Sequence, residues 1–203
     1  MVKLLVASNN AKKLKELEKI LADAGIEGIE LLPLSAVEAY PEPVEDGRTF
    51  ADNALIKARA GVQHTGLATI ADDSGLAVDE LNGMPGVLSA RWSGGHGDDE
   101  ANNRLLLGQM SHVPAERRAA AFVSVCALVT PDGQEHVVEG RWPGSLLTVP
   151  QGENGFGYDP LFQPEGETRS AAQMSPEEKN AVSHRGRALA QLREPLAALA
   201  GQA

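Results

Sequence analysis

Two adjacent carboxylates, Asp72 and Asp73, end an apolar run in the segment TIADDSGLAV, and Ser74 follows at once. A carboxylate in an apolar setting is costly unless a cation, a proton or a hydrogen bond compensates its charge. Paired carboxylates at the end of a strand suit Mg²⁺, which prefers oxygen ligands and shares them with phosphates. One of them can also accept a proton from water. The alternative is a turn in which Asp73 or Ser74 bonds to its own backbone.

The segment ASNNAKK, residues 7–13, is a candidate anion site. It lies between a predicted buried strand and a predicted helix, where free backbone N–H groups and the helix dipole favour negative charge. Asn9 and Asn10 add side-chain donors, and Lys12 and Lys13 add positive charge. The alternative is that Asn10 only caps the helix and both lysines lie on a solvated face. The Gly-x-x-x-x-Gly-Lys pattern of a Walker loop is absent.

Three charged residues near a second predicted helix could complete such a site. Glu45 and Asp46 lie in the proline-containing segment 35–47, an expected exposed loop, and offer another metal oxygen. Lys57 follows Asn53 by four residues on one helix face and could approach a phosphate. Taken alone, Glu45 and Asp46 are most simply solvated loop charges, and the alternative for Lys57 is an ordinary surface lysine.

The glycine-rich segment GENGFGYDP, residues 152–160, contains Phe156, Tyr158 and Asp159. Its glycines do not form the dinucleotide fingerprint, because Pro160 prevents an immediate helix. An exposed phenylalanine on such a loop can stack on a flat base, a contact worth about 1–3 kcal/mol. The alternative, in a chain with 4% aromatic residues, is that Phe156 and Tyr158 fill the core.

The segment EEKNAVSHRGRAL supplies further polar residues near the end of the chain. Ser175 is placed to cap a helix there, with Glu178 at the capping-box position. Lys179, His184 and Arg185 lie on either side of a predicted helix break and could donate hydrogen bonds to a base carbonyl. The alternative for His184 is a structural histidine. The histidines have no zinc-like spacing with the single cysteine.

Alternating strands and helices are expected to position these residues. Buried strands are predicted at 3–7 and 67–71, and the second strand ends at the acidic pair. Asn10 caps a first helix, and Thr49 caps a second one that ends before Gly66. A strand, a helix and a strand with short connections indicate a parallel element.

The second half of the chain has a different pattern. A helix is predicted over 98–110, followed by a long antiparallel hairpin of 119–130 and 134–142 around the turn PDG. A final helix from Arg187 is expected to be interrupted or kinked by Pro195. The fold class is therefore α/β, with a mixed, twisted central sheet flanked by helices.

Composition limits the possible partners and surroundings. The 203 residues, 42% of them hydrophobic, fit one compact domain with room for two lobes. No apolar stretch approaches the roughly 20 residues needed to cross a bilayer, and the N-terminus is too short in its apolar part for a signal peptide. The single cysteine, Cys126, predicts a buried, inert thiol and a reducing cytoplasm. A net charge of −10 argues against a nucleic-acid surface, so an anionic substrate needs local cations or a metal ion.

Five segments, taken in order, resemble the inosine triphosphate pyrophosphatase family, also described as XTP/dITP diphosphatases. They are ASNNAKKLKEL, EDGRTFADNALIKA, IADDSGLAVDELNGMPGVLSARWSG, GFGYDPLF and EEKNAVSHRGRAL. Each segment is weak by itself, but together they span nearly the whole chain. The resemblance implies one elongated, two-lobed domain over 1–203 with a nucleotide cleft between the lobes, and a homodimer. It also implies Mg²⁺-dependent hydrolysis of a nucleoside triphosphate to the monophosphate and pyrophosphate.

The resemblance further implies individual roles. Asp73 is the implied proton acceptor and metal ligand, with Asp72 beside it, and Glu45 rather than Asp46 is the implied metal ligand from the acidic loop. The expected substrate-binding residues are Ser8, Asn9, Asn10, Ala11, Lys12, Lys13, Lys57, Ser74, Phe156, Gly157, Tyr158, Asp159, Lys179, His184 and Arg185.

The expected substrates are noncanonical purine nucleotides: ITP, dITP and XTP. The bases of these nucleotides carry an oxygen at C6, and hydrogen-bond donors from His184, Arg185 or nearby backbone would pair with it. The same donors would disfavour adenine, whose C6 amino group is also a donor. Two alternatives stay open from the sequence. One is a pyrophosphatase of the septum-inhibitor (Maf) type acting on modified pyrimidine nucleotides, and the other is a nucleotide-binding module without turnover.

Overall fold

The structure is a computed structural model of the chain, which describes residues 1–8 and 11–201, without the side chains of Ala11, Lys12 and Asn180. The strands are β1 (Val2–Val6), β2 (Ile29–Pro33), β3 (Ala68–Val78), β4 (Met84–Pro85), β5 (Ala119–Val129), β6 (Glu135–Leu146) and β7 (Phe162–Pro164). The α-helices are α1 (Ala11–Asp23), α2 (Phe50–Thr65), α3 (Asp99–Gln109), α4 (Pro176–Val182), α5 (His184–Ala190) and α6 (Arg193–Ala200).

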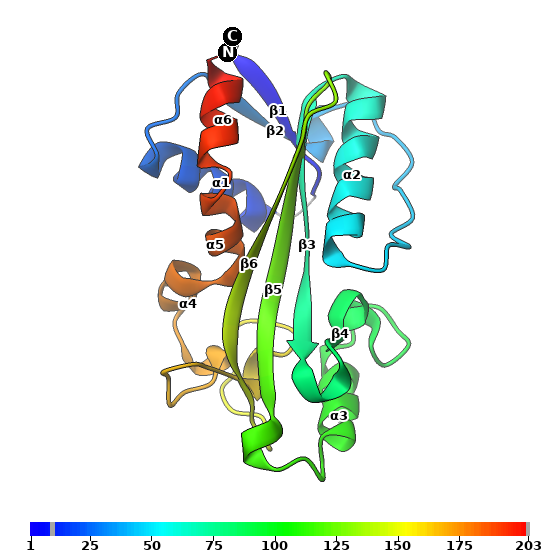
Figure 1. Ribbon diagram of the computed structural model, residues 1–203, viewed down its shortest axis with the longest axis vertical. Coiled ribbons are helices and arrows are strands. Elements are labelled where there is room, and N and C mark those ends of the chain that lie inside the picture. Colours follow the sequence, from blue (N-terminus) through cyan, green and yellow to red (C-terminus); the bar gives the residue numbers. More distant parts are fainter. Residues whose placement is uncertain (9–10, 202–203) are drawn as a thin grey trace. The chain divides into compact units, whose positions relative to one another are not determined.

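The strands form one mixed sheet in the described part of the chain. Their order is β2-β1-β3-β5-β6-β7, and β4 pairs with β3 (Figure 1). β1 runs parallel to β2 and β3, whereas β4 and β7 run antiparallel to their partners. The expected mixed α/β class is confirmed.

Internal contacts divide the chain into two compact units, which are described in turn. The first unit comprises Met1–Asp73, Ser124–Gly140 and Arg185–Ala203, and the second comprises Ser74–Val123 and Arg141–His184.

Strand alternation gives the first unit a core on each face of its strands. Leu4 and Ile70 belong to an apolar cluster with residues of α1, α5 and α6. Thr69 precedes Ile70 on β3 and faces the opposite side, toward α2, where a Cβ on Gly61 would lie 2.5 Å from the Thr69 Cγ2 atom. Figure 1 shows α2 on one side of these strands and α1 and α6 on the other. Gly61 therefore allows α2 to pack directly on the strands.

β3 is longer than the sequence predicts. The expected end at Ala71 is wrong, because the strand continues through Asp72 and Asp73 to Val78. Its pairing with β1 stops at Ile70, so the carboxylates lie just past the end of β1. The strand persists there because β5 and then β4 remain its neighbours. The short strands β2, β4 and β7 were not predicted from the sequence patterns.

The ends of α2 agree with the prediction. The Thr49 side chain accepts a hydrogen bond from the Asp52 backbone N–H, and the Asp52 carboxylate accepts one from the Thr49 N–H. Gly66 follows the helix in the left-handed conformation, with a φ of 68°. This capping box and C-terminal glycine satisfy backbone groups that the helix leaves unpaired at its ends.

β5 and β6 form the expected hairpin. The Thr130 N–H donates to the Gln134 carbonyl oxygen at 3.0 Å, and the Gly133 N–H donates to Thr130 at 2.9 Å. Gly133 has a φ of 88°, which favours glycine at this turn position. β6 extends to Leu146, beyond the predicted limit of the hairpin at Trp142.

The core of the second unit contains three aromatic rings from β5, β6 and β7. The Phe122 and Phe162 ring centroids are 4.7 Å apart, and those of Trp142 and Phe162 are 5.4 Å apart, both in edge-to-face geometry. Leu76 and Val78 of β3 belong to the same cluster. These few aromatic residues therefore fill the interior of one unit.

Arg118 is a buried arginine of the second unit, with 3% of its surface exposed. Its guanidinium donates hydrogen bonds to the carbonyl oxygens of Met110, Val113, Leu146 and Leu147 at 2.7 to 3.2 Å. Burial lowers the pKa of Arg118. The side chain links the end of α3 to the end of β6.

The last helices differ partly from the prediction. α4 has the expected capping box of Ser175 and Glu178. The expected helix from Arg187 is instead two helices, α5 and α6, which separate at Leu192. Pro195 lies in the first turn of α6, where its missing N–H costs little. In the described residues, no helix combines the length and apolar character that a membrane crossing requires.

Candidate functional site

Asp72 and Asp73 point to opposite faces of β3. Successive side chains of a strand alternate between faces, so Asp72 shares its face with Ile70, whereas Asp73 shares the α2 face with Thr69. The two carboxylates, adjacent in sequence, therefore have different partners.

Asp72 lies among cations of the first unit. The Lys13 Nζ atom is 2.7 Å from Asp72 Oδ1, and the Arg185 Nε atom is 3.4 Å from Oδ2. Arg185 also contacts Glu16, at 3.3 Å between Nη1 and Oε2. The Asp72 side chain is 11% exposed. Burial raises its pKa, but the charges of Lys13 and Arg185 outweigh burial and hold the pKa below its usual value.

A small cavity of about 20 Å³ lies beside Asp72. Such a volume holds about one water molecule. Its polar lining comes from Ser8, Lys13, Asp72 and Arg185, and Cys126 closes one wall. Burial raises the pKa of the Cys126 thiol to about 12, so the predicted buried and inert thiol is confirmed as buried and stays protonated at neutral pH.

Asp73 faces a different set of partners on α2. The Asn53 Nδ2 group donates to Asp73 Oδ2 at 3.0 Å, and Asn53 Oδ1 accepts from the Gly47 N–H at 2.9 Å. Asn53 is 2% exposed, so this buried amide connects the acidic loop with the carboxylate. Because a Cβ on Gly47 would lie 2.6 Å from Asn53 Oδ1, this close approach favours glycine.

Lys57 joins two carboxylates on this face. Its Nζ atom lies 2.8 Å from Glu45 Oε2 and 4.0 Å from Asp73 Oδ1. Those two carboxylates therefore converge on one cationic position, and carboxylate oxygens are the ligands that Mg²⁺ prefers. The donor chemistry of Glu45 and Asp73 fits a hard divalent cation. No group of three or more His, Cys, Asp or Glu side chains in the described residues is arranged to hold a metal ion.

The second unit presents an exposed aromatic ring beside a lysine. Phe156 is 65% exposed, and the Lys179 Nζ atom lies 4.9 Å from its ring centroid. Lys179 also pairs with Asp159, at 2.5 Å between Nζ and Oδ2, and Asp159 Oδ2 accepts from the Phe156 N–H at 2.9 Å. The exposed ring of Phe156 is therefore attached to a loop whose backbone is bound by the buried ion pair of Lys179 and Asp159.

Tyr158 has the structural role that the sequence left as an alternative. It is 4% exposed, and its hydroxyl donates to the Ser89 carbonyl oxygen at 2.8 Å. Burial raises the pKa of Tyr158. Two aromatic residues separated by one glycine thus differ: Tyr158 enters the core and Phe156 faces outward.

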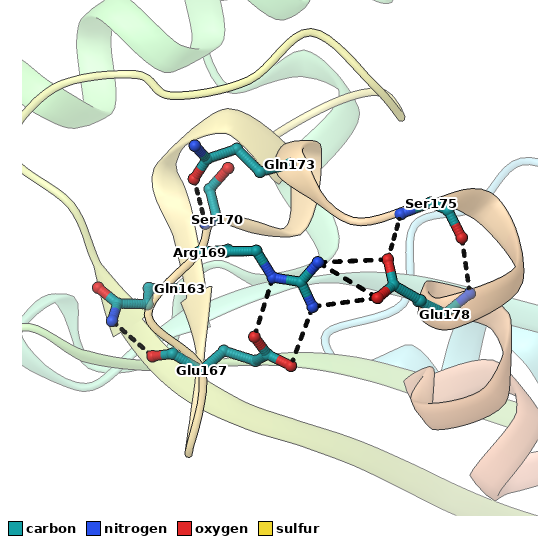
Figure 2. A network of polar contacts seen from close by, with 7 residues as sticks. All are labelled: Gln163, Glu167, Arg169, Ser170, Gln173, Ser175 and Glu178. Atoms are coloured by element: carbon teal, nitrogen blue, oxygen red, sulfur yellow. Dashed lines mark hydrogen bonds and ion pairs between the residues drawn. The ribbon is translucent and has the colours of Figure 1, made fainter.

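Lys179 follows a network of ion pairs at the start of α4, shown in Figure 2. Arg169 donates to both oxygens of Glu178 and to those of Glu167, at 3.2 to 3.4 Å. Glu178 Oε2 also accepts from the Ser175 N–H at 2.7 Å. These contacts fix the first turn of the helix that carries Lys179.

The remaining predicted residues have various positions. His184 stacks on Phe122, with ring centroids 5.2 Å apart and an interplanar angle of 15°. Ser8 and Ser74 are partly buried, Ser74 within β3. Asn9 and Asn10 lie outside the described residues, and Ala11 and Lys12 begin α1 without described side chains.

Comparison with known proteins decides the family. The profile of the Ham1 family matches residues 4–195. The chain belongs to the Ham1 family. This confirms the resemblance predicted from the five segments. The Ham1 chain is 71% identical over 196 residues to the dITP/XTP pyrophosphatase of Corynebacterium diphtheriae, covering 94% of this chain and 95% of that protein.

Solved structures agree with the Ham1 fold. The crystal structure of the nucleoside-triphosphatase / dITP/XTP pyrophosphatase from Mycobacterium abscessus is 66% identical, with a TM-score of 0.84, covering 94% of this chain and 97% of that one. The Staphylococcus aureus Ham1 protein is 36% identical, with a TM-score of 0.87 and coverages of 96% and 97%.

Sequence reasoning did not predict the hydrogen bond from Asn53 to Asp73 in this Ham1 chain. The signal was available, because Asn53 lies next to Ala54 on the inward side of α2, and a polar residue on a buried helix face needs a partner. Glu16, which pairs with Arg185, carried no such signal, since it falls on a helix with several other charges.

Proposed function

We propose that the chain hydrolyses noncanonical purine nucleoside triphosphates, namely dITP, XTP and ITP, to the nucleoside monophosphate and pyrophosphate. The observation that carries this proposal is its 71% identity, over nearly the full length of both chains, to a protein named dITP/XTP pyrophosphatase. The polar clusters of the two units support it, since one offers cations and carboxylates and the other an exposed ring.

In this proposal the phosphates bind the first unit. A triphosphate carries close to four negative charges, and the chain itself has a net charge of −10. Like charges about 4 Å apart repel by about 4 kcal/mol at an effective dielectric constant near 20. Among the described side chains, Lys13 and Lys57 are cations of the proposed phosphate region, and each is already close to a carboxylate. A divalent cation supplied with the substrate would offset the remaining repulsion.

Glu45 and Asp73 are the residues proposed to hold Mg²⁺. The metal, when bound, would polarise the phosphoryl oxygens and stabilise the developing charge. Asp73 accepts a proton from the attacking water, and Asn53 keeps its carboxylate oriented through Oδ2. Lys57, which lies beside both carboxylates, would add positive charge next to the phosphates. Asp72 was predicted as a further metal ligand, and this stays a prediction, since Lys13 and Arg185 already neutralise it.

The base binds the second unit in this proposal. Phe156 stacks on the purine ring. Lys179 lies over the Phe156 ring, is paired with Asp159, and adds positive charge beside the base. A donor aimed at C6, from His184 or nearby backbone, accepts a 6-oxo purine and rejects adenine, whose amino group is itself a donor. One nucleotide would then use residues of both units of a single domain.

The proposal extends to assembly and surroundings. Resemblance to the family supports a homodimer. A single buried cysteine, Cys126, supports a reducing cytoplasm, because a chain with one thiol forms no internal disulfide.

A hydrolysis panel tests the proposed function. Purified chain is incubated with Mg²⁺ and each of dITP, XTP, ITP, dATP, dGTP, dTTP, UTP and a methylated pyrimidine triphosphate, and pyrophosphate and orthophosphate are measured separately. We expect pyrophosphate release with dITP, XTP and ITP, and slow release with the others. Preference for the pyrimidines would identify a Maf-type activity, and tight binding of dITP without turnover would identify a nucleotide-binding module. Either outcome overturns the proposal.

A further inference from the structure

Two side chains of α3 hydrogen-bond to Gly157, the residue after Phe156 in the glycine-rich loop. The Gly157 N–H donates to Asp99 Oδ2 at 2.6 Å, and the Gly157 carbonyl oxygen accepts from Asn103 Nδ2 at 2.9 Å. Asp99 and Asn103 are four residues apart and therefore lie on the same helix face. Both polar groups of one backbone residue are thus bound by one helix.

The loop itself is a tight turn around Phe156. Gly155 and Gly157 have φ values of 80° and 60°, and a Cβ on Gly155 would lie 2.0 Å from Asp159 Oδ2. Asp159 accepts from the Phe156 N–H, and the Asp159 N–H donates to the Phe156 carbonyl oxygen at 3.3 Å. The backbone on both sides of Phe156 is therefore fixed, while the ring stays exposed.

Asn103 uses only part of its hydrogen-bonding capacity within the described residues. Its Oδ1 atom is buried and accepts no hydrogen bond from the described residues. A buried acceptor without a partner destabilises a fold, whereas an apolar side chain of similar size carries no such penalty. The contact of Asn103 that the structure does provide is the hydrogen bond from Nδ2 to Gly157. The amide is thus suited to holding the loop.

We propose that Asp99 and Asn103 are positioning residues for Phe156, which orient its ring for the base of the nucleotide. This inference rests on the proposed function, because it needs a flat base to bind there. A loop ordered before binding loses less conformational freedom when the ligand arrives. Loss of the α3 contacts should therefore weaken nucleotide binding through Phe156 and leave the phosphate end unaffected.

A double-mutant cycle tests the inference. Asn103→Leu, Phe156→Ala and the double variant are compared with the parent chain by kcat and KM for ITP, by inhibition with inorganic triphosphate, and by thermal unfolding. For Asn103→Leu we expect KM to rise about two- to tenfold, the effect of one net hydrogen bond. The expected kcat stays within twofold and Tm does not fall. Phe156→Ala should raise KM by about five- to a hundredfold.

The coupling between the two positions decides the outcome. If Asn103 acts through Phe156, the double variant has the KM of Phe156→Ala alone. Inhibition by inorganic triphosphate should be equal in every variant. Gln109→Ala is the matched control, since Gln109 lies on the same helix and accepts from the Trp92 Nε1 group instead of the loop. It should leave KM unchanged.

Three results would overturn the inference, and they are distinguishable. An unchanged KM in Asn103→Leu, or the same rise in KM with and without Phe156, removes the positioning role while base stacking stands. A lower Tm with weaker triphosphate inhibition assigns Asn103 to the fold. An unchanged KM in Phe156→Ala instead refutes base stacking in the proposed function, and the positioning role falls with it.

Discussion

The two faces of β3 differ in charge although they begin from adjacent, identical residues. On the Asp72 face, two cations, Lys13 and Arg185, meet two carboxylates, Asp72 and Glu16. On the α2 face, Lys57 lies between two carboxylates, Glu45 and Asp73. Among these described side chains, the charges on the first face balance, whereas those on the second leave one excess negative charge. The comparison teaches that two acids adjacent in a strand can have separate partners and different charge surroundings.

The largest expected effect comes from Asp73→Asn. The amide oxygen can still accept the hydrogen bond from Asn53, so folding should be retained, but the residue can no longer take a proton from water. We expect kcat for dITP hydrolysis to fall by roughly 10²- to 10⁴-fold, the usual contribution of a positioned general base. Pyrophosphate release measures this loss, and thermal unfolding provides the folding control. Retained turnover would refute the reactive role of Asp73.

Asp72→Asn should mainly lower the stability of the fold, whereas Asp73→Asn should mainly lower kcat. The substitution leaves Lys13 and Arg185 without their shared carboxylate in a largely buried place. Removal of one partner from a buried ion pair costs about 3–5 kcal/mol. We expect the free energy of unfolding in urea to fall by about that amount at neutral pH. A stable Asp72→Asn variant that has lost catalysis would show that the two faces have exchanged roles.

Glu45→Gln tests whether the acidic loop before α2 contributes a metal ligand on the Asp73 face of β3. We expect the Mg²⁺ concentration for half-maximal activity to rise at least tenfold, since even groups behind a ligand contribute about 10–100-fold to metal affinity. Unfolding should change little, because Glu45 is 31% exposed at its side chain. Asp46→Asn is the matched control from the exposed position next to it, and it should leave the Mg²⁺ requirement unchanged. The reverse result would transfer the ligand role to Asp46.

The smallest effect is a pH dependence confined to the Asp72 face. The folded-state pKa of Asp72 lies below its unfolded value, which is about 3.9. Its contribution to stability is therefore present above that value and is lost as pH falls through the folded pKa. The stability difference between the parent chain and Asp72→Asn should be constant from pH 7 to about 5 and shrink below pH 4. Urea unfolding across this range measures it, and a difference independent of pH would contradict the assignment.

Local signals predicted most of the elements. Thr49 and Gly66 gave the bounds of α2, and Ser175 with Glu178 gave the start of α4, because caps act within one helical turn. The end of β3 could not be predicted in the same way. Carboxylates and Gly75 disfavour a strand locally, and the neighbours that keep β3 extended come from distant segments.

The residues of the candidate site are a prediction from the sequence, but the sequence did not predict how they are arranged. The five segments identified Asp72 and Asp73, yet the division between two faces requires knowing that β3 continues beyond Ala71. Contacts such as that of Asn103 with Gly157 connect residues 54 positions apart in the chain. Such pairs depend on how elements pack, which spacing in the sequence does not report.

The buried guanidinium of Arg118 has a consequence for local opening. The Arg118 guanidinium donates to four carbonyl oxygens from the segments around Met110 and Leu146, so separation of these segments breaks several of its hydrogen bonds at once. In native-state hydrogen exchange, backbone amides near these two segments should share a single protection factor and exchange as one cooperative block. One amino acid thereby makes two remote stretches of backbone a single unit of unfolding.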